Sequence, residues 1–438
     1  MRTFCILFLL IISGTCFSQS AWDLRKCIHY ALQNNIQIKQ ASIQSETSGR
    51  QLRQARYNRL PSLNANIGDG FNFGRTLGSD NTYINQNSNS ASGSLSTSIP
   101  VFEGFRINND IAARKLDFMA SIEDQQKIKN DVSLTVASYF LNVLLQKEFL
   151  KIVQNQMTLT DTLLKRIEVL VSSGRESTAK LYELKAQLAN DVFNVTTAEK
   201  NLSLALLDLV QLLEIDDFLA FDVAIPKLLI DVSQMPIPVV VFENAVVTLP
   251  DVRAEEFRLE RSKKDLAIAR SAYFPSVSLS GSTSTGYFYM SGHDAVNDPF
   301  STQIERNWRS YVGMSMSIPI FNRMSVRTNV SINKLQIQNQ EFEVERAKKA
   351  IYKDIQRSML NAKVSKDRYI AAANSAEASQ KAFHFVTERF EAGRATFFDL
   401  QQSKNNLERA LSEQIQAKYE FIFNTKILDF YNGKEITL

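Results

Sequence analysis

The sequence predicts an α + β membrane protein. A shared transmembrane antiparallel β-barrel, with four strands per protomer, continues into a long periplasmic α-helical coiled-coil barrel. Three observations predict this fold class. Two stretches of about 70 residues lack glycine and proline, four segments alternate polar with apolar residues, and the motifs of the first half recur in the second. With 44% hydrophobic and 22% charged residues, the chain is not generally disordered.

Residues 1–18 have the pattern of a signal peptide. Arg2 supplies the positive start, residues 4–12 form the apolar run, and a small-x-small cleavage site ends at residue 18. This run is too short for a membrane-spanning helix, which needs about 20 residues. The rival interpretation is a lipoprotein signal with an acylated Cys16, although Thr15 is bulkier than the residue that usually precedes such a cysteine.

The mature chain offers little for catalysis or for binding a cofactor. Only Cys27 remains after cleavage, and the three histidines lie far apart in sequence. We find no HExxH, GxSxG, P-loop or paired CxxC motif, so we predict no enzyme activity, no cofactor and no metal site. The net charge of +4 without a dense basic cluster argues against nucleic acid as a partner.

The breaker-free stretches predict two very long helices, over residues 105–172 and 322–391. Glycine costs a helix interior about 1 kcal/mol and proline about 3 kcal/mol relative to alanine, so their absence is informative. At 1.5 Å per residue, each helix would be on the order of 100 Å long. Apolar residues follow a coiled-coil period, as in Val132, Val136, Tyr139, Val143, Leu150, Val153, Met157, Leu164 and Ile167, and again in Ile337, Val344, Ile351 and Ile355.

Each long helix ends at a glycine, which adopts the left-handed conformation most cheaply. Gly174 leads into a helix over 176–213, and Gly393 leads into a helix over 395–431. We therefore predict two helical hairpins.

The chain is an internal duplication, with repeats at 19–215 and 241–438 joined by a linker at 216–240. Ser98-Ile99-Pro100-Val101-Phe102 returns as Ser317-Ile318-Pro319-Ile320-Phe321, and Gly174-Arg175 returns as Gly393-Arg394, both 219 positions later. Each repeat is expected to open with a helix of medium length, over 21–60 and over 243–273.

Four strands are predicted, over residues 61–74, 91–102, 276–290 and 308–321. One face of each is apolar and would contact outer-membrane lipids, whereas the other is almost purely Ser, Asn and Gly. The alternative is a soluble β-sandwich with one wet face. Because open edges are not tolerated in lipid and four strands cannot close a barrel, copies must combine. Two, three or four copies satisfy this argument equally.

The layout resembles the TolC-type outer-membrane efflux proteins over essentially the whole mature chain. The residues that carry the resemblance are Trp22-Asp23-Leu24, Ala31-Leu32, Asn34-Asn35, Ala55-Arg56, Pro61-Ser62, Pro100-Val101-Phe102, Gly104 and Gly174, with their counterparts in the second half. The resemblance implies a homotrimer with a 12-stranded barrel and a 12-helix periplasmic tunnel. It also implies passive outward transport, in a tripartite efflux or type I secretion system, with a periplasmic adaptor protein and an inner-membrane RND or ABC transporter.

In that family the periplasmic mouth closes near the two turns, through charged and polar contacts and a ring of aspartates. Here Asp399 matches one gate aspartate, Gln402 stands where a second acid occurs, and Ala395 where an arginine occurs, while Phe390 replaces a tyrosine. The alternative for Asp399 is an acid in the first turn of a helix, favoured by the helix dipole.

The remaining candidates are tip residues at the two turns, Gly174, Arg175, Glu176, Gly393 and Arg394. The arginines would dock an adaptor hairpin or pair with acids of neighbouring helices, or they are solvated tip charges. The adjacent Phe397 and Phe398 are expected to pack or to seal the mouth. The alternative function is a periplasmic coiled-coil structural or adaptor protein with a soluble sheet. The sequence does not predict a substrate.

Overall fold

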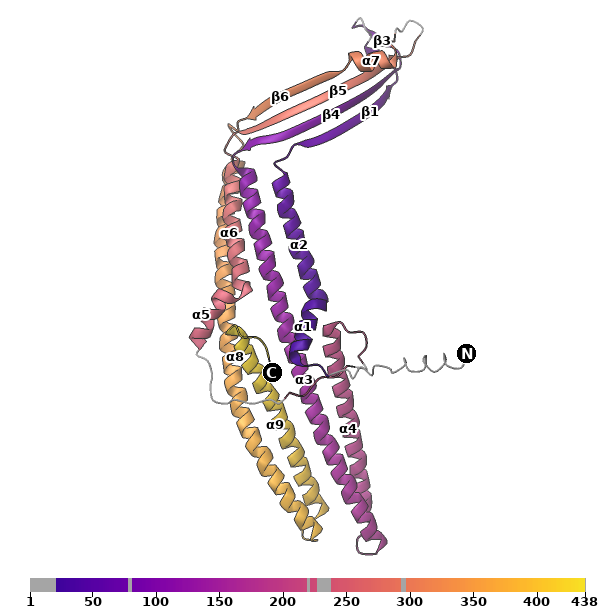
Figure 1. The fold of residues 1–438 in the computed structure, drawn as a ribbon, viewed down its shortest axis with the longest axis vertical. Coiled ribbons are helices and arrows are strands. Elements are labelled where there is room, and N and C mark those ends of the chain that lie inside the picture. The colour runs from indigo at the N-terminus through magenta and orange to yellow at the C-terminus, as the bar shows by residue number, and fades with distance from the viewer. Residues whose placement is uncertain (1–20, 78–80, 219–220, 227–237, 293–296, 438) are drawn as a thin grey trace, which may run out of the picture. The chain divides into compact units, whose positions relative to one another are not determined.

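The computed structural model describes residues 21–77, 81–218, 221–226, 238–292 and 297–437 (Figure 1). The predicted signal peptide with Cys16 lies outside the described residues, as do residues 227–237 of the predicted linker. The helices are α1 (Leu24–Asn34), α2 (Ile36–Tyr57), α3 (Arg106–Ser172), α4 (Thr178–Leu213), α5 (Pro238–Thr248), α6 (Pro250–Ser271), α7 (Phe300–Arg306), α8 (Ser325–Glu391) and α9 (Phe397–Tyr431). The strands are β1 (Ser62–Asn72), β2 (Arg75–Leu77), β3 (Tyr83–Asn85), β4 (Ser88–Glu103), β5 (Ser276–Met290) and β6 (Arg309–Ser317).

The chain forms two compact units. Residues 1–42, 124–252 and 347–438 make up the helical unit, and residues 43–123 and 253–346 make up the sheet unit. The long helices α3 and α8 contain 67 residues each. No helix within the described ranges combines the length and the apolar character needed to cross a lipid bilayer.

The duplication extends to backbone conformation at the start of each long helix. Gly104 and Phe105 have left-handed φ angles of 58° and 65°, and Arg323 and Met324, 219 positions later, have φ angles of 54° and 62°. Two consecutive left-handed residues cannot belong to a right-handed helix. For this reason α8 begins at Ser325 rather than at residue 322 as expected.

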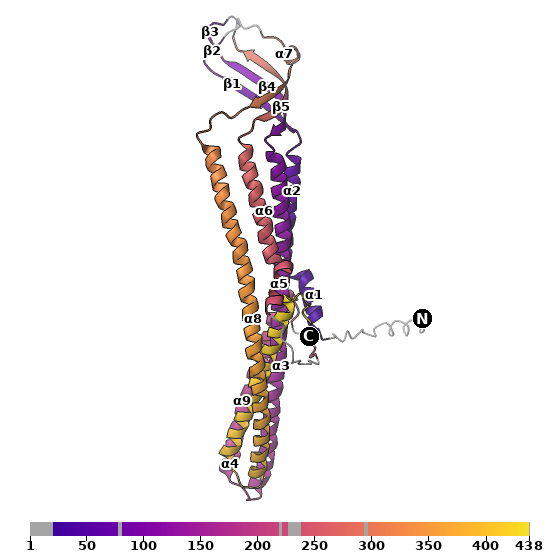
Figure 2. The ribbon, with the colours of Figure 1, turned by 90° about the vertical axis from the view of Figure 1, so that its left-hand side faces the viewer.

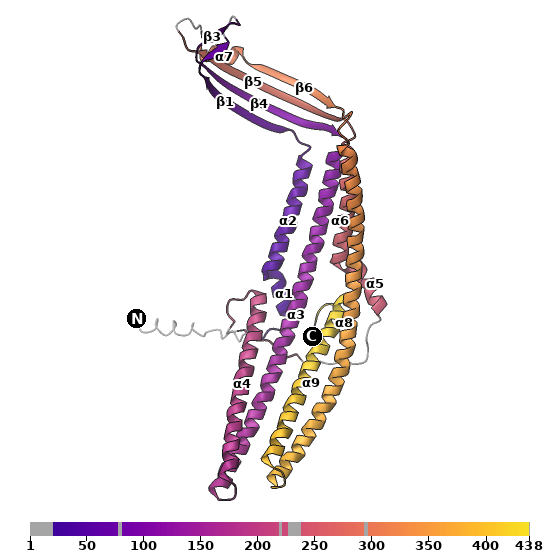
Figure 3. The same ribbon diagram turned by 180° about the vertical axis from the view of Figure 1, so that it is seen from behind.

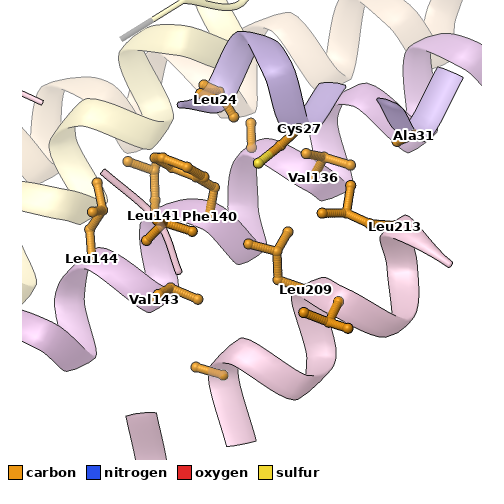
Figure 4. Close-up of a cluster of buried hydrophobic side chains, with 14 of the residues drawn as sticks. Leu24, Cys27, Ala31, Val136, Phe140, Leu141, Val143, Leu144, Leu209 and Leu213 are labelled. Atoms are coloured by element: carbon orange, nitrogen blue, oxygen red, sulfur yellow. The ribbon is translucent and has the colours of Figure 1, made fainter. Parts of the chain in front are cut away.

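The core of the helical unit joins α1, α3 and α4 (Figure 4). Leu24, Cys27 and Ala31 of α1 are spaced by three and four residues and lie on one face of this helix. They pack with Val136, Phe140, Leu141, Val143 and Leu144 of α3 and with Leu209 and Leu213 of α4, and each of these side chains is at most 3% exposed. Burial raises the pKa of the Cys27 thiol to about 12, so this cysteine is a packing residue.

Two helices that were expected to be single are divided. The segment 21–60 breaks at Asn35, whose backbone is not helical and whose side chain caps the start of α2 and bonds to the last turn of α4. Asn35 Oδ1 accepts from Gln37 N at 2.9 Å, and Asn35 Nδ2 donates to the Leu212 carbonyl at 3.0 Å. The segment 243–273 breaks before Pro250, which lacks the N–H that a continuous helix needs and instead opens α6.

The sheet unit contains one antiparallel four-stranded sheet, in the order β1-β4-β5-β6 (Figure 1). Ser94 of β4 pairs with Asn66 of β1 on one side and with Ser284 of β5 on the other. Because side chains alternate between faces, this register puts the serines of β4 and β5 on a single face. They are Ser88, Ser90, Ser92, Ser94, Ser96 and Ser98 on β4, and Ser276, Ser278, Ser280, Ser282 and Ser284 on β5.

The opposite face of the sheet is apolar and exposed. Ile67 is 91% exposed and Val312 is 78% exposed, with Leu95, Leu279, Met314 and Met316 on the same side. Exposed apolar surface of this extent marks a face that contacts lipid or another protein.

The irregular parts of the sheet differ from expectation in three places. Val101, expected in the apolar row, is the extra residue of a β-bulge between Pro100 and Phe102, so Phe102 takes the place opposite Val277. The segment between β1 and β4, expected as a plain loop, contains the short β2–β3 hairpin. The segment between β5 and β6 contains the one-to-two-turn helix α7.

Candidate functional site

The candidate site consists of the two helical hairpin tips in the helical unit (Figures 2 and 3). The first tip joins α3 to α4. Gly174 has a φ of 72°, its N–H donates to the Val171 carbonyl at 3.0 Å, and Arg175 N donates to the Leu170 carbonyl at 2.8 Å. These paired bonds form a Schellman motif, which satisfies the carbonyl groups at the end of the helix. Ser177 Oγ then caps α4 by accepting from Lys180 N.

The second tip joins α8 to α9 through the same motif. Gly393 has a φ of 69°, its N–H donates to the Phe390 carbonyl at 3.1 Å, and Arg394 N donates to the Arg389 carbonyl at 2.8 Å. The glycine is required because other residues pay about 1–2 kcal/mol for this left-handed conformation. The two turns therefore share hydrogen bonding as well as sequence.

Asp399 completes a capping box at the start of α9. Its Oδ2 accepts from Thr396 Oγ1 at 2.7 Å and from Thr396 N at 2.9 Å, while Asp399 N donates to Thr396 Oγ1 at 3.2 Å. The side-chain and backbone hydrogen bonds from Thr396 hold the pKa of Asp399 below its usual value, so the carboxylate stays ionised. The structure thus places Asp399 in the first turn of α9, as the alternative interpretation expects, and adds a capping role that the sequence analysis did not include. An exposed negative charge remains at the tip.

The two hairpins contact one another through Phe390, which is only 6% exposed. The Lys180 ammonium lies 4.3 Å from the centre of its ring, a cation–π contact between α4 and α8. Beside it, Arg166 of α3 and Glu391 of α8 form an ion pair at 2.6 Å. The apolar cluster beneath these contacts draws on all four helices and comprises Leu163, Leu164, Ile167, Leu184, Phe390 and Leu400.

Three of the other expected tip residues form no side-chain hydrogen bond or ion pair within the described part of the chain. Arg175, Arg394 and Gln402 are exposed. Glu176 precedes the first residue of α4 and forms an ion pair with Lys180, in the first turn of that helix, at 2.8 Å. The adjacent phenylalanines separate, because Phe397 packs against the tip cluster whereas Phe398 is 72% exposed.

Sequence reasoning missed Lys180, Arg166 and Glu391. Each contacts a residue more than 200 positions away, and none stands out by its local pattern. A sequence feature that points to this region is Phe390, which lies three positions before Gly393 and replaces a tyrosine of the resembling family. It marks the tip, but it does not identify the residues that contact it.

The family whose model matches the chain is described as outer membrane efflux protein, over residues 27–213 and 241–425. Outer membrane protein TolC of Escherichia coli is 24% identical over 189 residues, 40% of this chain and 38% of that protein. The pyoverdine export outer membrane protein OpmQ of Pseudomonas aeruginosa is 25% identical over 381 residues, 82% of this chain and 74% of that protein.

Among solved structures, CusC matches with a TM-score of 0.77 at 17% identity, covering 96% of each chain. A likeness at this identity speaks for the fold, and it confirms the predicted fold class. The family model covers both repeats. The chain belongs to the outer membrane efflux protein family, and it is a channel protein of the outer membrane.

Proposed function

We propose that three copies of this chain form the exit duct of a tripartite efflux or type I secretion system, which conducts substrates passively and catalyses no reaction. The observation that carries the proposal is the two-faced sheet, with serines on one side and exposed apolar side chains on the other. The serine face would line a water-filled lumen, and the apolar face would contact outer-membrane lipids.

The trimer follows from the edges of this sheet together with the family. β1 and β6 are its outermost strands and each has one unpaired edge within the described chain. A membrane sheet must close, so β6 of one copy would pair with β1 of the next. Three copies of the four-stranded sheet give the twelve strands that the family resemblance implies.

The domain boundaries that we propose are a signal peptide at 1–18, repeats at 19–215 and 241–438, and a linker at 216–240.

The location of the protein in the outer membrane is tested by cell fractionation. We expect the mature protein to remain with outer membranes through an alkaline wash and to require detergent for release. Release into the periplasmic fraction would instead favour a soluble coiled-coil spacer.

The tips are the proposed contact with a periplasmic adaptor protein, itself coupled to an inner-membrane RND or ABC transporter. Arg175 and Arg394 support this because they are exposed and make no ion pair with any described residue. A photo-crosslinking residue at either position should capture the adaptor in cells, whereas the same residue at the exposed Lys381 on α8 should not.

The contact of Phe390 with Lys180 and the ion pair of Glu391 with Arg166 are proposed to hold the periplasmic mouth closed. The Glu391 carboxylate lies 2.6 Å from the Arg166 guanidinium, so Glu391→Lys would replace this attraction by repulsion between like charges and drive the hairpin tips apart. We expect this variant to raise single-channel conductance in a planar bilayer several-fold. The matched control is Glu377→Lys on the same helix, whose carboxylate pairs only within α8. Equal conductance in the two variants would remove Glu391 from the gate.

Asp399 is proposed to add a ring of three carboxylates that favours cations at the mouth. Asp399→Asn keeps a side-chain oxygen that can accept from Thr396 but removes the charge, whereas Asp399→Ala removes both. We expect both variants to lower the ratio of cation to anion permeability, measured by reversal potential, and only Asp399→Ala to lower the melting temperature. Unchanged selectivity in Asp399→Asn would leave Asp399 with the capping role alone.

A further inference from the structure

A buried ion pair joins the two repeats inside the helical unit, away from the tips. Lys404 of α9 places its Nζ 2.6 Å from Asp191 Oδ2 on α4. The exposed fractions of these side chains are 6% and 3%. Charged side chains are almost never buried to this degree unless they are paired, so the burial of each of these two side chains depends on the presence of the other.

Neutral donors and acceptors complete the cluster. Lys404 Nζ also donates to Thr160 Oγ1 on α3 at 2.7 Å, and Thr160 Oγ1 lies 2.5 Å from Asp191 Oδ2. Gln187 Nε2 donates to the other carboxylate oxygen of Asp191 at 2.7 Å. Both oxygens of Asp191 are therefore satisfied, and three helices meet at one point. We call Thr160, Asp191 and Lys404 the anchor.

The anchor interrupts an otherwise apolar seam. On the side toward the tips, Leu164, Leu184 and Leu400 belong to the tip cluster. On the other side, Val153, Val195 and Ala198 form a separate buried cluster. The hydrophobic effect has no fixed direction, so apolar packing specifies the register of a helix less strictly than a polar contact does. A buried ion pair does specify the register, because a shift of one helical turn, about 5.4 Å, would leave both charges buried without a partner.

The ion pairs between the two hairpins are more exposed toward the tips than at the anchor. Below the anchor the polar contacts are exposed, with side-chain exposures of 53% for Arg166 and 42% for Glu391. Above it, Glu148 of α3 accepts from Lys418 at 2.8 Å and from Tyr419 at 2.7 Å. The anchor is thus the polar contact between α3 and α9 that comes first above the tip cluster.

We propose that the anchor is the fixed point of the mouth, which keeps α9 in register with the α3–α4 hairpin and confines opening movements to the tip segments. These segments are residues 161–172 of α3 and 397–403 of α9, roughly 10–20 Å long at 1.5 Å per residue. The proposal rests on the proposed function insofar as the movement opens a channel.

The test measures distances on both sides of the anchor in the full-length trimer, with one spin-labelled subunit in three and a Cys27→Ala background. Labels at Ser173 and Ala392 report on the tips. Labels at Asn155 and Arg409, which are exposed, report on the segment between the anchor and the Glu148 contact. The variants are Lys404→Met and, as matched control, Lys381→Met, which breaks an exposed pair within α8.

We expect Lys404→Met to at least double the width of the Asn155–Arg409 distance distribution and Lys381→Met to leave it unchanged. In Glu391→Lys, the Asn155–Arg409 distribution should keep its wild-type width. The proposal is wrong if Lys404→Met leaves this width unaltered, or if Glu391→Lys increases it while Lys404 is intact.

A second variant covers the case in which Lys404→Met does not assemble. Asp191→Leu with Lys404→Met leaves neither member of the ion pair without its partner. It should form trimers that show the same doubled width, and a wild-type width would overturn the proposal.

Conductance of the wild-type protein is measured separately. Absence of a pore would reject the proposed function, whereas the distance widths would still decide whether the anchor holds the helices.

Discussion

Lys404→Met is expected to lower the free energy of unfolding by about 3–5 kcal/mol, the cost of leaving one member of a buried ion pair without its partner. Methionine has a similar length but supplies no charge, so the Asp191 carboxylate, at 3% exposure, would stay buried with Gln187 and Thr160 as its remaining donors. The measurement is denaturant unfolding of the purified trimer, followed by the loss of helical circular dichroism.

Two controls separate the buried charge from the loss of a lysine. Lys381→Met removes an ammonium group that is 69% exposed, and its effect should be within about 0.5 kcal/mol of zero. The double variant Asp191→Leu with Lys404→Met should be far closer to wild type than the single variant, because well-packed apolar residues often replace a buried pair at little cost. A single variant as stable as Lys381→Met would contradict the burial argument.

Ile67→Arg is expected to prevent or strongly reduce barrel assembly. Ile67 lies in the middle of β1, is 91% exposed, and stands on the apolar face opposite Gly93. An arginine on the lipid face near the bilayer midplane costs about 2–4 kcal/mol per subunit. Because three subunits would share one barrel, this destabilisation would occur at three positions in each assembly. Assembly is measured as the fraction of heat-modifiable trimer in isolated outer membranes.

The neighbouring residue provides the control. Asn66 lies on the serine face, opposite Ser94, so Asn66→Arg would put the same side chain into the lumen. We expect normal assembly of this variant. If Asn66→Arg fails and Ile67→Arg assembles, the assignment of the two faces is reversed, and the barrel would have its serines toward lipid.

Local sequence patterns predicted the secondary structure well where one residue decides the outcome. Gly174 and Gly393 end α3 and α8 because the turn needs a left-handed residue, and that requirement is local. The alternation of polar and apolar residues in β1 and β4 predicted the two faces of the sheet, because successive side chains of a strand point to opposite faces. Local patterns failed at Asn35, where the residue that breaks the helix also bonds to the Leu212 carbonyl, 177 positions away.

Packing between distant segments was beyond such patterns. In the coiled-coil seam of α3, Val136 and Val143 are fully buried as expected, but Tyr139 is 37% exposed. A period of three and four residues selects a helix face, but only the neighbouring helices decide which members of that face are covered.

Spacing along the chain was sufficient to predict the duplication, the lengths of the hairpins, the two-faced strands and the family. The tertiary structure alone decided which charged side chains meet. Lys404 and Asp191 are 213 residues apart, and Lys180 reaches Phe390 from the other repeat. Such contacts depend on the relative register of separate hairpins, which no local period specifies. They also depend on burial, which distinguishes Lys404 from the exposed lysines of the same chain.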